Sequence, residues 1–173
     1  MRTFISIKLP PKVLIQIKNI QDKLPGFIGK KTELKNLHLT LKFLGEISRD
    51  KVEEIKSNLS KINFNKFEAD IGDVGFFDNP HHGIIWLGIS NCGGLQKEVD
   101  NSLEALFKKE IRFMGHLTIA RVKELQDKKK FLSGLKEIKI PKMFFIVDRF
   151  YLMESKLKKE GPHYKEIESF NLI

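Results

Sequence analysis

Two short motifs in this chain combine a histidine with a threonine two residues later, and the two motifs are 78 residues apart. Histidine can hold or release a proton near pH 7, and a threonine hydroxyl can donate a hydrogen bond to a negatively charged oxygen. If both motifs lie on strands, each histidine projects beside its threonine, because residues i and i+2 share a face. Two such pairs across a cleft could hold one phosphodiester between a general base and a general acid. The motifs are His38-Leu39-Thr40-Leu41 and His116-Leu117-Thr118-Ile119.

One copy of this motif would be weak evidence for catalysis, because a histidine and a threonine on a strand can simply face water. Two copies at equivalent places are stronger evidence, since structural histidines rarely need a threonine at the same offset. Each proton transfer would contribute about 10²- to 10⁴-fold to the rate, and the threonine hydroxyls would stabilise charge on the non-bridging oxygens. The pattern therefore predicts acid–base catalysis at a phosphate.

The elements that must position these motifs follow the same order in both halves of the chain. In the first half, the spacing of apolar residues predicts a strand over 3–9, a helix between Pro10-Pro11 and Pro25-Gly26, a strand over 37–44, a helix after the N-cap residue Ser48, and an extended segment over 64–77. In the second half it predicts strands over 83–89, 116–122 and 144–153, with helices over 95–109 and 126–135 between them. The order β-α-β-α-β is therefore predicted twice.

An internal duplication favours two similar lobes about a pseudo-two-fold axis, because equivalent strands then lie across a shared cleft. We predict an α+β fold of two pseudo-symmetric lobes, each a β-α-β-α-β repeat with a mainly antiparallel sheet that lines the central cleft. The chain is expected to form one bilobal domain over 1–173, with repeat halves at about 1–78 and 79–173. A doubly wound parallel sheet is the alternative, but it would need phosphate-binding glycines after the first strand, where the chain has Pro10-Pro11.

The composition is typical of a globular domain. Of the 173 residues, 41% are hydrophobic and 31% are charged, and no apolar run reaches the roughly 18 residues that a membrane span needs. The first ten residues alternate hydrophobic with polar, unlike a signal peptide, so the expected location is cytoplasmic. The formal charge of +9 favours polyanionic partners, although scattered lysines usually only solvate a surface. The lone Cys92 can form neither an internal disulfide nor a multi-cysteine metal site.

The two motifs and their surroundings resemble the His-x-Thr-x signatures of the 2H phosphoesterase superfamily, specifically its RNA 2′,3′-cyclic phosphodiesterase branch, also called 2′-5′ RNA ligase. The similarity runs through nearly the whole chain. The segments that carry it are 2–7, 38–46, 83–88, 116–121, 154–157 and 161–164.

The resemblance implies a metal-independent hydrolase without a cofactor, which opens the terminal 2′,3′-cyclic phosphate of RNA to a 2′-phosphate, with reversible 2′-5′ ligation as a side activity. Carried over by position, His38 is the proton donor to the departing 3′ oxygen, and His116 is the proton acceptor that activates water. The opposite assignment of donor and acceptor is the alternative. The expected partner is RNA with a cyclic phosphate end or a cyclic nucleotide, with no membrane, and we expect a monomer. The substrate-binding residues that the resemblance implies are Thr40, Thr118 and Arg121 at the phosphate and Phe43 at a base.

Strict alternation conflicts with part of this assignment. It places Arg121 on the face opposite the second histidine, so a contact with phosphate requires the strand to bend or end near Ala120. By the same count Lys42 faces the site, and Phe43 faces away from the first histidine, which makes packing the alternative role for Phe43. Gly115 stands where the family commonly has a proline before the second motif.

The remaining histidines and the single tryptophan have simpler interpretations. His81, His82 and His163 fall in predicted turns, without the carboxylate partners of a recognisable metal site. Trp86 lies between Ile85 and Leu87, which favours packing in the core, with stacking on a nucleobase as the alternative.

Two rival functions follow from the same residues. The first is a non-catalytic module that holds phosphorylated RNA ends on its basic surface, but such a module would not need two titratable histidines. The second is a phosphodiesterase for another small cyclic or 2′-5′-linked nucleotide. A panel of substrates would distinguish it from an RNA 2′,3′-cyclic phosphodiesterase.

Overall fold

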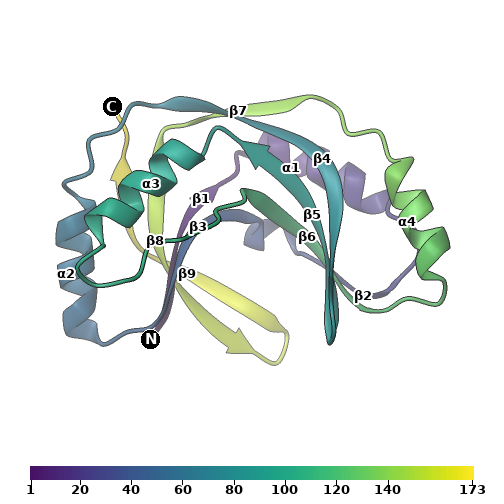
Figure 1. Ribbon diagram of the computed structural model, residues 1–173, viewed down its shortest axis with the longest axis horizontal. Helices are drawn as coiled ribbons and strands as arrows, with labels where there is room; N and C mark the ends of the chain where they lie inside the picture. Colours follow the sequence, from purple (N-terminus) through teal and green to yellow (C-terminus); the bar gives the residue numbers. More distant parts are fainter.

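The computed structural model describes residues 1–173 and shows an arched sheet with its helices at the periphery (Figure 1). The elements of the first half are β1 (Arg2–Lys8), α1 (Pro11–Asp22), β2 (Ile28–Lys31), a 3₁₀ turn (Leu34–Asn36), β3 (His38–Glu46), α2 (Arg49–Leu59) and β4 (Phe67–Asn79). Those of the second half are β5 (His82–Ser90), α3 (Gly93–Ser102), β6 (His116–Glu124), α4 (Lys128–Lys136), β7 (Met143–Val147), β8 (Arg149–Lys158) and β9 (Gly161–Asn171).

The strands form one sheet in the order β7-β4-β5-β6-β3-β1-β8-β9, with β2 added beside β6. Every pairing is antiparallel. Leu39 and Leu117 are the single pair that joins β3 to β6, so the sheet divides there into two lobes. Lobe one contains β3, β1, β8 and β9, and lobe two contains β6, β5, β4, β7 and β2. The predicted α+β fold with an antiparallel sheet is confirmed, and the parallel alternative is wrong.

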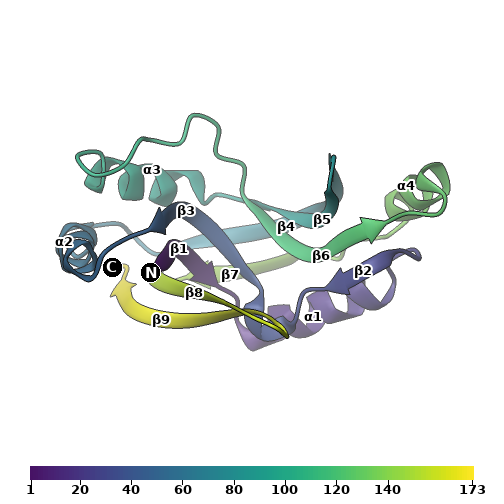
Figure 2. The ribbon, with the colours of Figure 1, turned by 90° about the horizontal axis from the view of Figure 1, so that it is seen from below.

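The junction between the lobes carries the symmetry of the repeat. Leu39 and Leu117 are the second residues of the two motifs, so each is the equivalent of the other. An antiparallel pair in which a residue meets its own equivalent has a local two-fold axis between the two strands. The axis passes between β3 and β6, which lie side by side in Figure 2.

A long strand from each half of the chain crosses into the opposite lobe. Strand β4 belongs to the first half of the chain, yet it pairs with β5 and β7 of the second half. Strand β8 belongs to the second half, yet it pairs with β1. Each lobe is therefore completed by a strand from the other half.

Four features differ from the predicted elements. Strand β2 was not predicted because all four of its residues are exposed, so it has no apolar alternation. Strand β9 was missed for a related reason, since most of its residues are only partly buried. Helix α3 ends at Ser102, and turns follow it up to about residue 107. The predicted strand over 144–153 divides at Asp148, because β7 pairs with β4 in lobe two while β8 pairs with β1 in lobe one.

Local sequence signals explain where the helices begin. Helix α1 starts at Pro11. The N–H at the first position of a helix has no acceptor inside the helix, so proline, which lacks this N–H, loses no hydrogen bond there. Helix α2 follows Ser48, whose hydroxyl accepts a hydrogen bond from the Lys51 N–H at 3.4 Å, so the predicted N-cap is confirmed. Asp127 caps α4 in the same way, through the Lys130 N–H at 3.0 Å.

The apolar faces of these elements meet in one hydrophobic core of 36 buried residues from both halves of the chain. Ile5, Leu39, Ile85 and Leu117 are almost fully buried and come from four neighbouring strands, two in each lobe. The core therefore continues beneath the junction of the lobes. None of the four helices is long and apolar enough to cross a membrane.

Candidate active site

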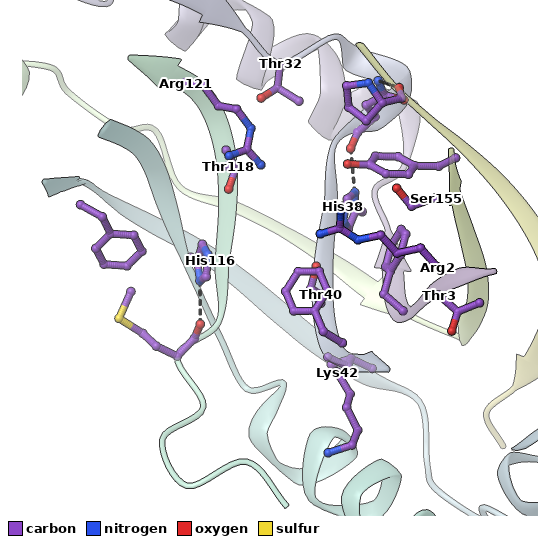
Figure 3. Close-up of a pocket in the computed structure, with 18 of the residues that line it drawn as sticks. Arg2, Thr3, Thr32, His38, Thr40, Lys42, His116, Thr118, Arg121 and Ser155 are labelled. Atoms are coloured by element: carbon purple, nitrogen blue, oxygen red, sulfur yellow. Dashed lines mark hydrogen bonds between the residues drawn. The ribbon is translucent and has the colours of Figure 1, made fainter. Parts of the chain in front are cut away.

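Strands β3 and β6 present their two motifs to one cleft of about 580 Å³. Residue by residue, the two strands share the same sequence of exposed and buried positions. His38, Thr40, His116 and Thr118 all line the cleft, as the alternation of the two motifs predicts. Because the strands run antiparallel through Leu39 and Leu117, each threonine lies opposite the histidine of the other motif, as Figure 3 shows.

A β-bulge in each strand changes which side chains face the cleft after the motif. In β6, Ala120 pairs with Ile85 and Thr118 pairs with Trp86, so Ile119 has no partner in the ladder. Ile119 and Ala120 are both fully buried, and the next residue, Arg121, turns back to the cleft. The bend near Ala120 that an Arg121 contact requires is therefore present.

The equivalent bulge in β3 lies at Leu41, since Lys42 pairs with Ile5 and Thr40 pairs with Ser6. Lys42 is among the residues that line the cleft, as alternation predicts, but it is only 3% exposed, and Figure 3 shows its side chain directed away from the histidines. The expectation that Phe43 faces away from the first histidine is wrong. Phe43 is 67% exposed and lines the cleft.

Both histidine rings are held by a backbone carbonyl two residues earlier. His38 Nδ1 lies 2.7 Å from the Asn36 oxygen, and His116 Nδ1 lies 2.8 Å from the Met114 oxygen. A carbonyl can only accept, so Nδ1 carries the proton and donates it, and in the neutral ring Nε2 is the free base. Neither Nε2 has a hydrogen-bond partner within the protein. The repeat thus presents two equivalent proton-transfer atoms.

The surroundings of the two rings differ. The His38 ring lies between Phe4, at 4.9 Å between ring centroids, and Tyr164, at 5.0 Å. Burial lowers the pKa of His38 below its usual value; the hydrogen bond to Asn36 opposes this, and the positive charge of Arg121 lowers the pKa further. His116 makes one aromatic contact, with Phe77 at 5.4 Å.

The cleft is positively charged. Arg2, Arg112 and Arg121 line it together with Lys30 and Lys31. These side chains come from both lobes, because Arg2 lies on β1 and Arg121 on β6. Guanidinium groups bind phosphate oxygens in a bidentate manner, so such a cleft favours a phosphorylated ligand.

Two of these arginines affect the pKa of Tyr164, a residue that was not predicted from the sequence to belong to the site. Burial raises the pKa of Tyr164, while the charges of Arg121 and Arg2 oppose that change. Tyr164 lines the cleft from β9, and the weak alternation of that strand explains why neither the strand nor this residue was predicted.

The other candidate residues do not join the site. The exposed residues His81, His82 and His163 are absent from the lining of the cleft. No group of three histidine, cysteine, aspartate or glutamate residues could hold a metal ion. Burial raises the pKa of the Cys92 thiol to about 12, which leaves it unreactive.

Trp86 packs against Phe77 at 5.1 Å between ring centroids and does not line the cleft, but it is only partly buried and does not belong to the hydrophobic core that holds Ile85 and Leu87.

Comparison with known proteins shows which family this chain resembles in sequence and fold. The family model described as LigT-like phosphoesterase matches residues 7–86 and 91–164. Proteins named RNA 2′,3′-cyclic phosphodiesterase are similar over nearly full length: that of Methanocaldococcus jannaschii is 34% identical, covering 98% of this chain and 100% of its own, and that of Archaeoglobus fulgidus is 32% identical, covering 98% and 99%. That of Thermotoga maritima is 36% identical, covering 95% and 92%.

Solved structures share the fold. A Thermus thermophilus protein superposes with a TM-score of 0.81 at 25% identity, covering 99% of this chain and 97% of its own. Escherichia coli LigT complexed with 3′-AMP superposes with a TM-score of 0.80 at 23% identity, covering 99% and 97%. With the family model matched over most of its length, this chain belongs to the LigT-like phosphoesterases of the 2H phosphoesterase superfamily.

Proposed function

We propose that this protein is an RNA 2′,3′-cyclic phosphodiesterase, which hydrolyses a terminal 2′,3′-cyclic phosphate to a 2′-phosphate. The observation that carries the proposal is the pair of histidines in one positive cleft, each anchored at Nδ1 and each with a free Nε2. A hydrolase of phosphodiesters needs one group to take a proton from water and another to give a proton to the leaving oxygen. The curated relatives carry the same activity in their names.

In the mechanism that we propose, His116 Nε2 takes a proton from a water molecule while the oxygen of that water bonds to phosphorus. The bond between phosphorus and the ribose 3′ oxygen breaks, and His38 Nε2–H gives its proton to that oxygen. Thr40, Thr118 and Arg121 stabilise the charge on the non-bridging oxygens. Neither threonine hydroxyl has a partner within the protein, and both residues line the cleft, so both hydroxyls are free to donate to phosphate.

The lowered pKa of His38 constrains this scheme. At neutral pH the free protein holds His38 mainly in its neutral form, whereas a proton donor must be charged. An anionic phosphate beside the ring favours the imidazolium, because an opposite charge stabilises the protonated form. Substrate binding and proton uptake by His38 are therefore coupled.

Two further contacts complete the proposal. Phe43 lies 6.3 Å from Phe4 between ring centroids and offers an exposed ring at the cleft for a nucleobase. A 5′ hydroxyl in place of water would take the same route to phosphorus and leave a 2′-5′ linkage, which is the ligation that the family resemblance implies. The monomeric state and the cytoplasmic location stay predictions.

The test uses cytidine 2′,3′-cyclic phosphate and an oligoribonucleotide with a cyclic phosphate end, both in EDTA, with ³¹P NMR to distinguish 2′ from 3′ phosphate. We expect turnover to the 2′-phosphate in the chelator and a loss of about 10²- to 10⁴-fold in kcat for His38→Gln and for His116→Gln. His82→Gln is the matched control, since His82 is exposed and outside the cleft, and should keep full activity.

Three results would contradict the proposal. Full activity in either cleft variant would exclude acid–base catalysis by the pair. RNA binding with strong salt dependence but without turnover would indicate a binding module instead. Turnover of other cyclic or 2′-5′-linked nucleotides alone would assign a different substrate.

A further inference from the structure

Lys42 and Asp100 form a buried ion pair close to the active site, with side chains only 2% and 5% exposed. Lys42 Nζ donates to Asp100 Oδ1 at 2.5 Å and to the carbonyl oxygen of Lys108 at 2.7 Å. Asp100 Oδ2 accepts from Gln96 Nε2 at 2.7 Å and from the Glu110 N–H at 2.9 Å. Burial would raise the pKa of Asp100, but these hydrogen bonds outweigh it and hold the pKa below its usual value.

Two of these bonds reach the connection between α3 and β6. Residues 108–114 of this connection make no backbone–backbone hydrogen bond of their own. Its backbone is held instead at the Lys108 oxygen, by Lys42, and at the Glu110 N–H, by Asp100. The connection resumes regular pairing at Gly115, whose oxygen accepts from the Ile89 N–H at 3.0 Å.

The same connection supplies parts of the active site. Arg112, Phe113 and Met114 line the cleft. The Met114 oxygen is the acceptor that orients His116 through Nδ1. Whatever fixes residues 108–114 therefore also fixes the ring that we assign as the base.

Stability alone does not account for a charged pair at this place. The energy needed to remove two charges from water offsets much of the attraction between them in a buried ion pair. Apolar residues of similar size therefore often stabilise a protein as well as such a pair, or better. The repeat contains its own comparison: the position in β6 equivalent to Lys42 is Ala120, which is fully buried without an ion pair. The strand itself thus accepts an apolar residue here.

We propose that Lys42 is a positioning residue, which holds residues 108–114 through Asp100 and the Lys108 carbonyl and so keeps His116 aligned opposite His38. This inference rests on the proposed function for its catalytic consequence. Lys42 follows the first motif on β3, so the strand that carries one histidine anchors the segment that orients the other. Misplacement of a catalytic group by about 1 Å can cost roughly 10²-fold in rate.

The experiment compares four variants by kcat and KM on the cyclic phosphate and by hydrogen–deuterium exchange over 108–114. Lys42→Met and Asp100→Asn should lower kcat by roughly 10- to 100-fold, with a smaller change in KM and faster exchange in the segment. Val99→Ala is the matched control: Val99 is fully buried on the same helix but outside the network, so it should lose stability and keep kcat. The double variant Lys42→Leu/Asp100→Leu leaves no unpaired buried charge and serves where a single variant does not fold.

The double variant separates positioning from a purely structural role. If the pair only stabilises the fold, restoring stability with two leucines also restores kcat, which would overturn the inference. If it positions the segment, kcat stays low, because the bonds to Lys108 and Glu110 are still missing. Unchanged exchange of the Glu110 N–H, the amide of 108–114 that Asp100 holds, in Lys42→Met would overturn the inference whether or not the wild type turns over substrate. An inactive wild type would instead overturn the proposed function, and exchange alone would then decide.

Discussion

The two histidines obtain the same orientation from the same local device, a carbonyl two residues upstream that receives the Nδ1 proton. Their environments nevertheless diverge, because the His38 ring alone lies between two aromatic rings. Duplication thus supplied two copies of one side-chain arrangement, and the neighbouring aromatic residues made the copies chemically different. Such divergence is how one fold assigns acid and base roles to like residues.

The lowered pKa of His38 predicts a pH-dependent contribution to stability. Between the unfolded value of about 6.5 and the lower folded value, the unfolded state binds more protons than the folded state. The free energy of unfolding therefore rises with pH across this window, and the contribution is lost as pH falls. Urea denaturation at pH 5 and pH 8 should show a smaller pH dependence for His38→Gln than for the wild type. Equal pH dependence in the two proteins would contradict the direction of the shift.

At the residue scale, the sequence was sufficient for the four motif side chains, because period-two alternation holds from each histidine to its threonine. It failed three residues after each threonine, at Phe43 and Arg121, which alternation places on the opposite face but which line the cleft. The bulges at Leu41 and Ile119 place two consecutive residues in the core, and nothing in the residue types around them signals an extra residue in the ladder. The orientation of side chains beyond a bulge is a property of the pairing, so a single strand cannot reveal it.

At the scale of elements, the short strand β2 contributes charge to the cleft despite its weak sequence signal. Lys30 and Lys31 lie on it and line the cleft. Strand β2 approaches β6 closely at Gly29, where a Cβ would lie 2.1 Å from the Arg121 carbonyl oxygen. Glycine is therefore required for this pairing, which also covers the edge of the strand that carries the second motif.

Gly29→Ala should destabilise the protein by about 1–3 kcal/mol, because the added methyl group collides with backbone that cannot move away without breaking the β2–β6 pairing. It should also raise KM, since displacement of β2 moves Lys30 and Lys31. Gly26→Ala is the control: its Cβ would meet no atom within 4 Å, so stability and KM should stay near wild type. Urea denaturation and steady-state kinetics measure both effects, and equal behaviour of the two variants would show that β2 adapts freely.

At the scale of the whole molecule, the crossing of β4 and β8 makes the two repeats dependent on each other. The sequence predicted the duplication from the spacing of the motifs, but it could not show which lobe each strand joins. Strand pairing over long separations is decided by the complete set of neighbours, and β7 and β8 lie in different lobes although Asp148 alone separates them.

We expect neither half to fold independently, which extends the prediction of one domain over 1–173. A chain break in the turn between β4 and β5, after Pro80, would leave the first fragment with β4 unpaired, and in the second fragment β8 would keep β9 but lose its pairing with β1. Each fragment alone should lack a cooperative unfolding transition by circular dichroism. An equimolar mixture should regain both the transition and turnover. Cooperative unfolding of either isolated fragment would contradict this expectation.

The two-fold relation between β3 and β6 has a stereochemical consequence. An atom on that axis has the two imidazoles on opposite sides, which is the arrangement that an in-line displacement at phosphorus requires of its entering and departing oxygens. Because the axis exchanges the two sides, the site is nearly the same whichever side the entering oxygen comes from and whichever side the departing oxygen leaves by. The same two histidines can therefore serve the forward and the reverse reaction. The nucleophile that is present, water or a ribose hydroxyl, decides which reaction takes place.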